Sequence, residues 1–173
     1  MDALTELGVS GFQSFLAISG EPCKPFDQAR NGISLGEACA TIVLASERNK
    51  DEKTSVEIVG GATSNDANHI SGPSRTGEGL VKAIEHAFRQ NQISAGQIDF
   101  ISAHGTATPY NDEMEAIAFS RTGLDGVPVN SFKGYYGHTL GAAGVLETVL
   151  TSLSMKNNLL IRSLGYASHG VSK

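Results

Sequence analysis

Two histidines stand at equivalent places in this chain, each in a loop that follows an apolar, strand-like run. His104 comes directly after IDFISA (98–103), and His138 follows VPVNS (127–131) after a short loop that contains glycine. A neutral imidazole can donate one N–H to an oxygen on which negative charge develops, or it can act as a general base. A single loop histidine is often only a surface or capping residue, but two in equivalent loops favour a shared chemical role.

Four charged residues lie close to these histidines in the sequence. Glu147 sits inside an otherwise apolar helical run, where an unpaired carboxylate would be costly, and Lys133 is its natural partner. Lys133 could otherwise be a solvated loop charge. Asp112 and Glu115 fall at the head of the helix after His104, where helix capping and dipole compensation of about 0.3–1 kcal/mol each would explain them.

Other kinds of site fit these residues less well. The two histidines lack the short spacing and the thiolate company of zinc motifs, so we expect no metal. The glycines around His138 do not form a dinucleotide-binding loop, and the chain has no P-loop motif. Cys23 lies in a turn flanked by prolines and Cys39 enters a strand-like run, so we expect both to be structural.

The second half of the chain repeats a strand–loop–helix pattern, which predicts two neighbouring parallel strands in an α/β sheet. The two histidine loops then reach the same edge of that sheet, where ligands bind. Residues 138–156 are apolar nearly all round, which predicts a helix buried between two layers. At the start of that helix, the positive end of the helix dipole would keep His138 neutral.

The first half gives simpler expectations. Residues 2–19 predict a helix interrupted at Gly8 and Gly11, and residues 38–46 and 55–62 predict an antiparallel hairpin around the hydrophilic loop 47–54. An amphipathic helix capped by Thr76 follows. Its predicted buried face consists of Leu80, Ile84, Ala87 and Phe88.

Composition limits the class of protein. The chain has 173 residues, of which 40% are hydrophobic, so it suits a single domain with a real core and not a disordered chain. The net charge of −5 argues against a broad nucleic-acid surface. The longest apolar run is interrupted by Glu147 and is too short for a membrane span, and the N-terminus lacks a signal-peptide pattern. We therefore expect a cytoplasmic protein, with residues 1–173 as one unit.

Longer stretches around the histidines resemble the β-ketoacyl-[acyl-carrier-protein] synthases. HGTATPYND followed by E-x-x-A, and NSFKGYYGHTLGAAGVLE, look like the two histidine motifs of that family. The segments GFQSFLAIS, KPFDQARNGISLGEACATIVLAS and TSNDANHISGP agree with it, so the resemblance covers nearly the whole chain. It implies a thiolase-type layered fold, a mixed sheet flanked by helices with a buried central helix, of which this chain is mainly the C-terminal half.

The resemblance also implies an activity, the decarboxylative Claisen condensation of malonyl-acyl-carrier-protein with an acyl thioester. His104 and His138 would stabilise the enolate oxygen and assist decarboxylation. A charged network of Lys133, Glu147, Asp112 and Glu115 would orient them, and Thr106 and Thr108 would bind the phosphopantetheine arm. No cofactor is implied apart from that arm. The implied partners are acyl carrier protein and an N-terminal half, with dimerisation of the full-length protein.

Three departures from the family pattern qualify this expectation. The nucleophilic cysteine of the family lies in a first half that this sequence lacks, so we expect a piece truncated at both ends and inactive alone. The C-terminal G-F-G-G segment of the family is absent, and the chain has SLGYASHGVSK instead. FKGYYGH replaces the usual T-K-S-x-x-G-H, and this replacement would reshape the pocket near Phe132, Tyr135 and Tyr136. The alternative is a non-catalytic partner subunit related to the chain-length factors. Acyl chains of different length, and both fatty-acid and specialised polyene or polyketide pathways, are compatible with these motifs.

Overall fold

The computed structural model describes residues 1–46, 55–68 and 74–173. At its centre β1 (Ile101–Ser102) and β2 (Val129–Asn130) form a parallel pair, with Ile101 opposite Val129. Each strand is followed by a loop and then by helix, as the repeated sequence pattern predicts. The two histidine loops therefore leave the same edge of the sheet.

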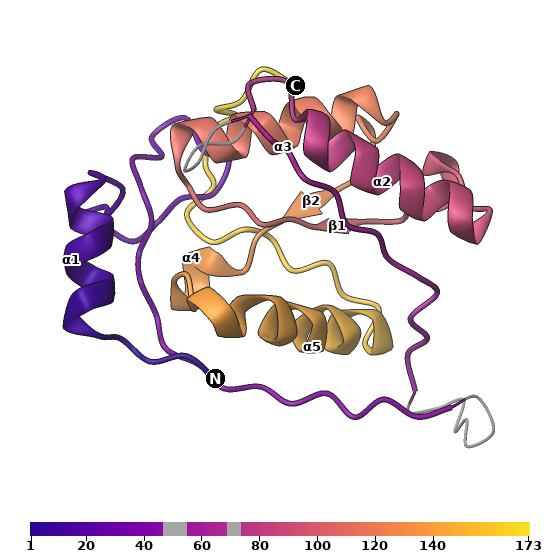
Figure 1. Cartoon of the computed structure of the whole chain (residues 1–173), viewed down its shortest axis with the longest axis horizontal. Coiled ribbons are helices and arrows are strands. Elements are labelled where there is room, and N and C mark those ends of the chain that lie inside the picture. Colours follow the sequence, from indigo (N-terminus) through magenta and orange to yellow (C-terminus); the bar gives the residue numbers. More distant parts are fainter. Residues whose placement is uncertain (47–54, 69–73) are drawn as a thin grey trace.

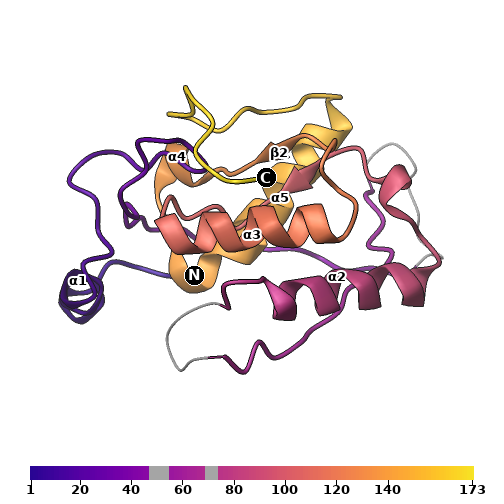
Figure 2. The same cartoon turned by 90° about the horizontal axis from the view of Figure 1, so that it is seen from above.

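Helices flank this pair on both sides (Figures 1 and 2). The helices α2 (Glu78–Asn91) and α3 (Pro109–Arg121) lie on one side, and α5 (Ala143–Lys156) lies on the other. Short helical turns complete the connections: η2 (Ala95–Gln97) before β1, then α4 (Lys133–Tyr136) and η3 (Leu140–Ala142) between β2 and α5. The predicted α/β architecture is confirmed.

The main core lies between α2, α3 and the sheet. Phe119 of α3 packs with Phe26, Ala103 and Leu124, and the predicted apolar face of α2 lies against this cluster through Leu80, Ile84 and Phe88. Val81 of α2 is also buried. The amphipathic pattern of this helix is therefore confirmed in nearly every position.

The predicted helix caps are shifted. The N-cap of α2 is Gly77, which adopts a left-handed conformation (φ +64°), and not Thr76. The N-cap of α3 is Thr108, with Pro109 in the first turn. Asp112 is therefore not a cap, because it lies one turn inside the helix and its carboxylate points to other backbone segments.

The first helix, α1 (Glu6–Ser14), runs through both glycines at which an interruption was predicted. The Thr5 hydroxyl accepts a hydrogen bond from Gly8 N at 3.1 Å and caps its first turn. A glycine inside a helix costs only about 1 kcal/mol relative to alanine, which does not by itself break the helix. The helix stands apart from the body of the molecule (Figures 1 and 2).

The predicted hairpin does not form. Residues 38–46 and 55–62 are irregular, and Val43 and Leu44 are 87% and 76% exposed. Within the described ranges, the one bridge that involves these segments joins Ala38 to Asp2, so they lack the neighbouring strand whose hydrogen bonds would hold an apolar run extended. The connecting loop 47–54 lies outside the described residues.

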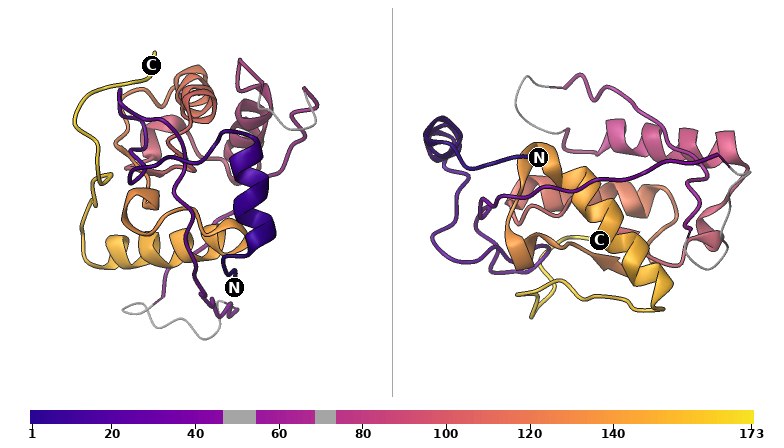
Figure 3. Two further views of the ribbon diagram at one scale, coloured as in Figure 1. Left: turned by 90° about the vertical axis from the view of Figure 1, so that its left-hand side faces the viewer. Right: turned by 90° about the horizontal axis from the view of Figure 1, so that it is seen from below.

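The prediction that the last helix is buried on every side is also wrong for this chain. Only Ala143 and Ser154 of α5 are buried, while Leu153 and Met155 are each 50% exposed. Viewed from below, α5 faces outward (Figure 3, right). The helix covers the sheet on one side, and within the described residues no second layer covers its other side. No helix in those same ranges is both long and apolar enough to cross a membrane.

Candidate active site

His104 is held in place through its backbone. It follows β1 directly, and Glu115 accepts hydrogen bonds from His104 N at 2.8 Å and from Gly105 N at 2.7 Å. Gly105 has a positive φ (+45°), and a side chain there would collide with Ser131 and Phe26. The loop can therefore turn sharply only with glycine at this position, and the Glu115 carboxylate fixes the turn.

Asp112, one turn before Glu115 on α3, holds the next part of the same loop. It is fully buried and accepts hydrogen bonds from Ala107 N at 3.1 Å and Phe26 N at 2.7 Å. The Arg30 guanidinium lies 3.9 Å from the same carboxylate. Burial raises the pKa of Asp112 to about 6 and that of Glu115 to about 7, against the lowering effect of these hydrogen bonds. Both carboxylates thus position the His104 loop, a role beyond the dipole compensation considered from sequence.

His138 is clamped by a segment far away in the sequence. Its N–H donates to Ser34 O at 2.6 Å, and its carbonyl accepts from Gly36 N at 3.1 Å. A side chain at position 36 would collide with the Tyr136 carbonyl, so glycine permits this close approach. Sequence reasoning missed residues 34–36 as part of the site, and Gly36 was the signal that could have indicated them.

Lys133 lies in the segment between β2 and His138, and its side chain contacts the His104 loop. Its ammonium group donates to Glu147 Oε1 at 2.5 Å, to the His104 carbonyl at 2.6 Å and to His104 Nδ1 at 3.4 Å. The Lys133 side chain is 1% exposed, and all three of its donors are used. The ion pair predicted for Glu147 is therefore confirmed, and the pair contacts His104 directly.

These contacts fix the tautomers of both rings. An ammonium group can only donate, so His104 Nδ1 is an acceptor and the proton of the neutral ring is on Nε2. His138 Nδ1 accepts from Leu140 N at 3.1 Å, which places its proton on Nε2 as well. Neither Nε2–H has a hydrogen-bond partner among the described residues, so each ring can donate one N–H to a ligand.

The two rings lie next to each other. Their centroids are 5.0 Å apart and their planes make an angle of 80°. The pKa of each is lowered to about 4, chiefly because burial disfavours the imidazolium and next because of the positive charge of Lys133. His138 is thus neutral as predicted, although the cause is burial and Lys133, and the residue lies before η3 and outside α5.

Both rings line a cavity of about 1020 Å³. Thr106 and Thr108 line it too, and their hydroxyl oxygens lie 2.9 Å apart, within hydrogen-bonding distance. Phe12 and Phe15, from the end of α1, form part of an apolar wall that sequence reasoning did not identify. The expected effect of Phe132, Tyr135 and Tyr136 on this pocket is not seen among the described residues, since none of the three lines it.

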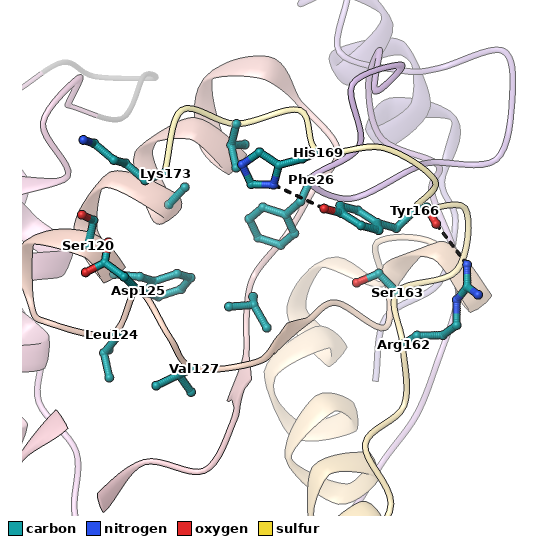
Figure 4. Close-up of a pocket in the computed structure, with 14 residues that line it drawn as sticks. Phe26, Ser120, Leu124, Asp125, Val127, Arg162, Ser163, Tyr166, His169 and Lys173 are labelled. Carbon is teal, nitrogen blue, oxygen red and sulfur yellow. Dashed lines mark hydrogen bonds between the residues drawn. The ribbon is translucent and has the colours of Figure 1, made fainter. Parts of the chain in front are cut away.

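A second cavity, of about 310 Å³, contains neither histidine of the pair (Figure 4). Its walls include Phe26, Leu124 and Val127, and Tyr166 closes one side with its hydroxyl 3.3 Å from His169 Nδ1. The two cysteines lie outside both cavities: Cys23 is buried with its thiol against the Lys133 carbonyl at 3.0 Å, and Cys39 is exposed.

The sequence of this chain is similar to those of known proteins. The chain is 38% identical over 168 residues to 3-oxoacyl-[acyl-carrier-protein] synthase 2 of Coxiella burnetii, covering 90% of this chain and 41% of the relative. It is 34% identical over 179 residues to the putative mitochondrial 3-oxoacyl-[acyl-carrier-protein] synthase of Schizosaccharomyces pombe, covering 94% of this chain and 42% of the relative. The chain thus spans about two fifths of the length of these curated relatives.

Solved structures agree. A type II polyketide ketosynthase in complex with its acyl carrier protein superposes with a TM-score of 0.89 at 28% identity, over 97% of this chain and 45% of that one. A β-ketoacyl synthase from Burkholderia phymatum gives a TM-score of 0.86 at 29% identity, over 98% and 43%. The fold is therefore that of the ketosynthases.

Family models divide the chain in two. Residues 55–167 match the model of the β-ketoacyl synthase C-terminal domain, and residues 2–50 match that of the N-terminal domain. The first match alone covers more than half of the chain, and it includes both histidine loops. This chain belongs to the β-ketoacyl synthase family.

Proposed function

We propose that this chain supplies the two-histidine part of a 3-oxoacyl-[acyl-carrier-protein] synthase. The proposed reaction is the decarboxylative Claisen condensation of malonyl-acyl-carrier-protein with an acyl thioester. The observation that carries the proposal is the pair of neutral rings in one cavity, each with its proton on Nε2. Two such donors suit a single oxygen on which negative charge develops.

In the first step the bond between the malonyl methylene carbon and its carboxylate breaks and CO₂ leaves. The electron pair of that bond moves into the thioester, which becomes an enolate with its negative charge on oxygen. His104 and His138 donate their Nε2 protons as hydrogen bonds to that oxygen. In the second step the enolate carbon attacks the acyl carbonyl, a C–C bond forms, and the thiolate that held the acyl group leaves.

The charged residues then act on the rings and not on the substrate. Lys133, paired with Glu147, keeps His104 Nδ1 an acceptor and disfavours a positive ring through its own charge. Asp112 and Glu115 fix the backbone from which His104 extends. Thr106 and Thr108 offer hydroxyl groups to the amides of the phosphopantetheine arm. No cofactor other than that arm enters the proposed reaction.

We place the acyl-bearing cysteine in another part of the full synthase, which corresponds to the portion of the relatives outside the matched region. This agrees with the positions of Cys23 and Cys39, neither of which lines the histidine cavity. The same proposal includes dimerisation of the whole synthase, a cytoplasmic location, and acyl carrier protein as partner, which one structural relative holds in its complex.

A non-catalytic partner subunit is the second candidate. Two structural relatives are complexes of a ketosynthase with a chain length factor. The complete histidine pair and its buried Lys133–Glu147 support favour the catalytic subunit, because a pocket-shaping subunit does not require two free Nε2–H donors. The residue that takes the place of the family's nucleophilic cysteine in the full protein discriminates the two: cysteine supports the enzyme.

A chimaera tests the proposal. Residues 1–173 replace the matched region of the Coxiella burnetii synthase, and malonyl-dependent condensation is measured. His104→Ala and His138→Ala should each lower the rate by about 10²–10³-fold, the effect of losing one oxyanion donor. His86→Ala, on the exposed face of α2, is the matched control and should leave the rate unchanged. An unchanged condensation rate after His104→Ala or His138→Ala would refute the catalytic role of the histidine pair. A folded chimaera that does not catalyse condensation would refute it as well.

A further inference from the structure

The histidine cavity has an apolar side and a polar side. Phe12, Phe15 and Met114 contribute to the first, while Thr106 and Asn111 contribute to the second, together with Arg75. A ligand that fills this cavity is therefore amphiphilic. Its polar part must also match the charge of the lining.

Arg75 provides the positive charge of that lining. His104 and His138 are neutral, and the Glu113 carboxylate accepts hydrogen bonds from the backbone N–H and hydroxyl of Ser172. Among the described residues that line the cavity, this leaves Arg75 as the one positive charge. The lining thus has one cationic side chain and one carboxylate, and since Glu113 is held by Ser172, Arg75 is the group of the lining that can pair with an anionic group of a ligand.

The guanidinium of Arg75 has no hydrogen bond or ion pair with any described residue, and the residue is exposed. Other arginines are engaged: Arg30 donates to the Pro109 carbonyl, Arg121 pairs with Glu78 at 2.8 Å, and Arg162 donates to the Tyr166 carbonyl. With respect to the described residues, the N–H donors of Arg75 are therefore unused, and its planar guanidinium can bind two oxygens of a phosphate group at once.

We propose that Arg75 is a specificity residue of the cavity, which binds the phosphate of a phosphopantetheine thioester. This inference rests on the proposed function, since that function brings the arm into the cavity. The arm is an uncharged chain of amides that ends in a phosphate. When its thioester lies at the histidine pair, the polar wall accepts the amides, and Arg75 is the group that can neutralise the phosphate.

A matched pair of ligands isolates this contact. Pantetheine and 4′-phosphopantetheine differ only by the phosphate, and their binding to residues 1–173 can be compared by isothermal titration calorimetry. Phosphopantetheine should bind roughly fivefold more tightly, as an exposed but bidentate ion pair allows. Arg75→Gln should reduce this preference to none. Arg89→Gln, which removes an exposed arginine of α2 away from the cavity, should keep it.

The outcomes separate this inference from the function on which it rests. Equal binding of the two ligands, or a preference that survives Arg75→Gln, overturns the role of Arg75 and leaves the proposed function standing. Absence of binding by both ligands counts against both. Acyl carrier protein with and without its arm gives a further test: Arg75→Gln should weaken only the form that carries the arm, and equal weakening of both forms would assign Arg75 to a protein contact instead.

Discussion

The surroundings of the histidine pair and the outer side of α5 show opposite relations between polarity and burial. Around the histidines, Lys133, Asp112 and Glu115 are buried although their side chains are ionisable, and each has hydrogen-bond partners inside the chain. On α5, Leu153 and Met155 are half exposed although they are apolar. The groups that position the histidines thus find their partners among the described residues, whereas those same residues cover the apolar helix on one side only.

The difference has a physical origin. Each buried charge near the site meets a partner that lies in a loop leaving the same sheet edge, so a short stretch of chain satisfies it. The apolar side chains of α5 and of residues 42–44 need a broad surface, which a short loop cannot provide. Polar contacts can therefore be complete where hydrophobic burial is not.

Removal of one member of the buried ion pair should give the largest effect. Lys133→Met leaves the Glu147 carboxylate without its cation, and we expect it to lower the free energy of unfolding by roughly 3 kcal/mol. Urea denaturation of the variant measures the change. The double variant Lys133→Met/Glu147→Met should recover most of the loss, because an apolar pair replaces a buried ion pair at little cost. A double variant as unstable as the single one would contradict this account.

The pH dependence of stability should be small, because two sets of groups oppose each other. His104 and His138 have lowered pKa values, so they contribute stability above pH 6.5 that is lost as the pH falls through about 4. Asp112 and Glu115 have raised pKa values. They contribute stability that is complete below their ordinary values of 3.8 and 4.5 and is lost as the pH rises through about 6 and about 7.

Glu115→Gln unbalances these contributions. It removes one group that stabilises the fold on acidification and leaves both histidines, so stability should fall, by an amount on the order of 1 kcal/mol, between pH 6.5 and pH 4.5. Urea denaturation at several pH values measures this, with the exposed Glu85→Gln as control. NMR titration should find both imidazoles neutral with Nε2–H tautomers and midpoints near pH 4. Midpoints near 6.5 would contradict the site geometry.

The smallest effect on stability belongs to the outer side of α5. Leu153→Ser should change the free energy of unfolding by less than about 0.5 kcal/mol, since the side chain is half exposed. It should also lower the binding of a hydrophobic dye and any self-association measured by sedimentation, because it interrupts an apolar surface. Leu124→Ser, in the core, should instead cost several kcal/mol, on the order of a large-to-small core substitution. Similar losses for both variants would show that α5 is covered.

Short-range patterns determined much of this protein. The repeated strand–loop–helix units predicted parallel strands and a common edge for His104 and His138, because the carboxyl ends of parallel strands meet there. The charge of Glu147 within an apolar run predicted its pairing with Lys133. The amphipathic spacing predicted the packed face of α2. Each of these properties depends on periodicity or on a single buried charge, which a linear sequence displays.

Only the tertiary structure decided the properties that depend on distant partners. Residues 38–46 and 55–62 look like strands, but no strand of the described ranges lies beside them, and those ranges cover the apolar residues of α5 on one side alone. The clamp of Ser34 and Gly36 on His138, and the hydrogen bond from Phe26 N to Asp112, join segments whose approach no local pattern encodes. Propensity describes what a segment can form, whereas burial and hydrogen bonding depend on which other segments lie beside it.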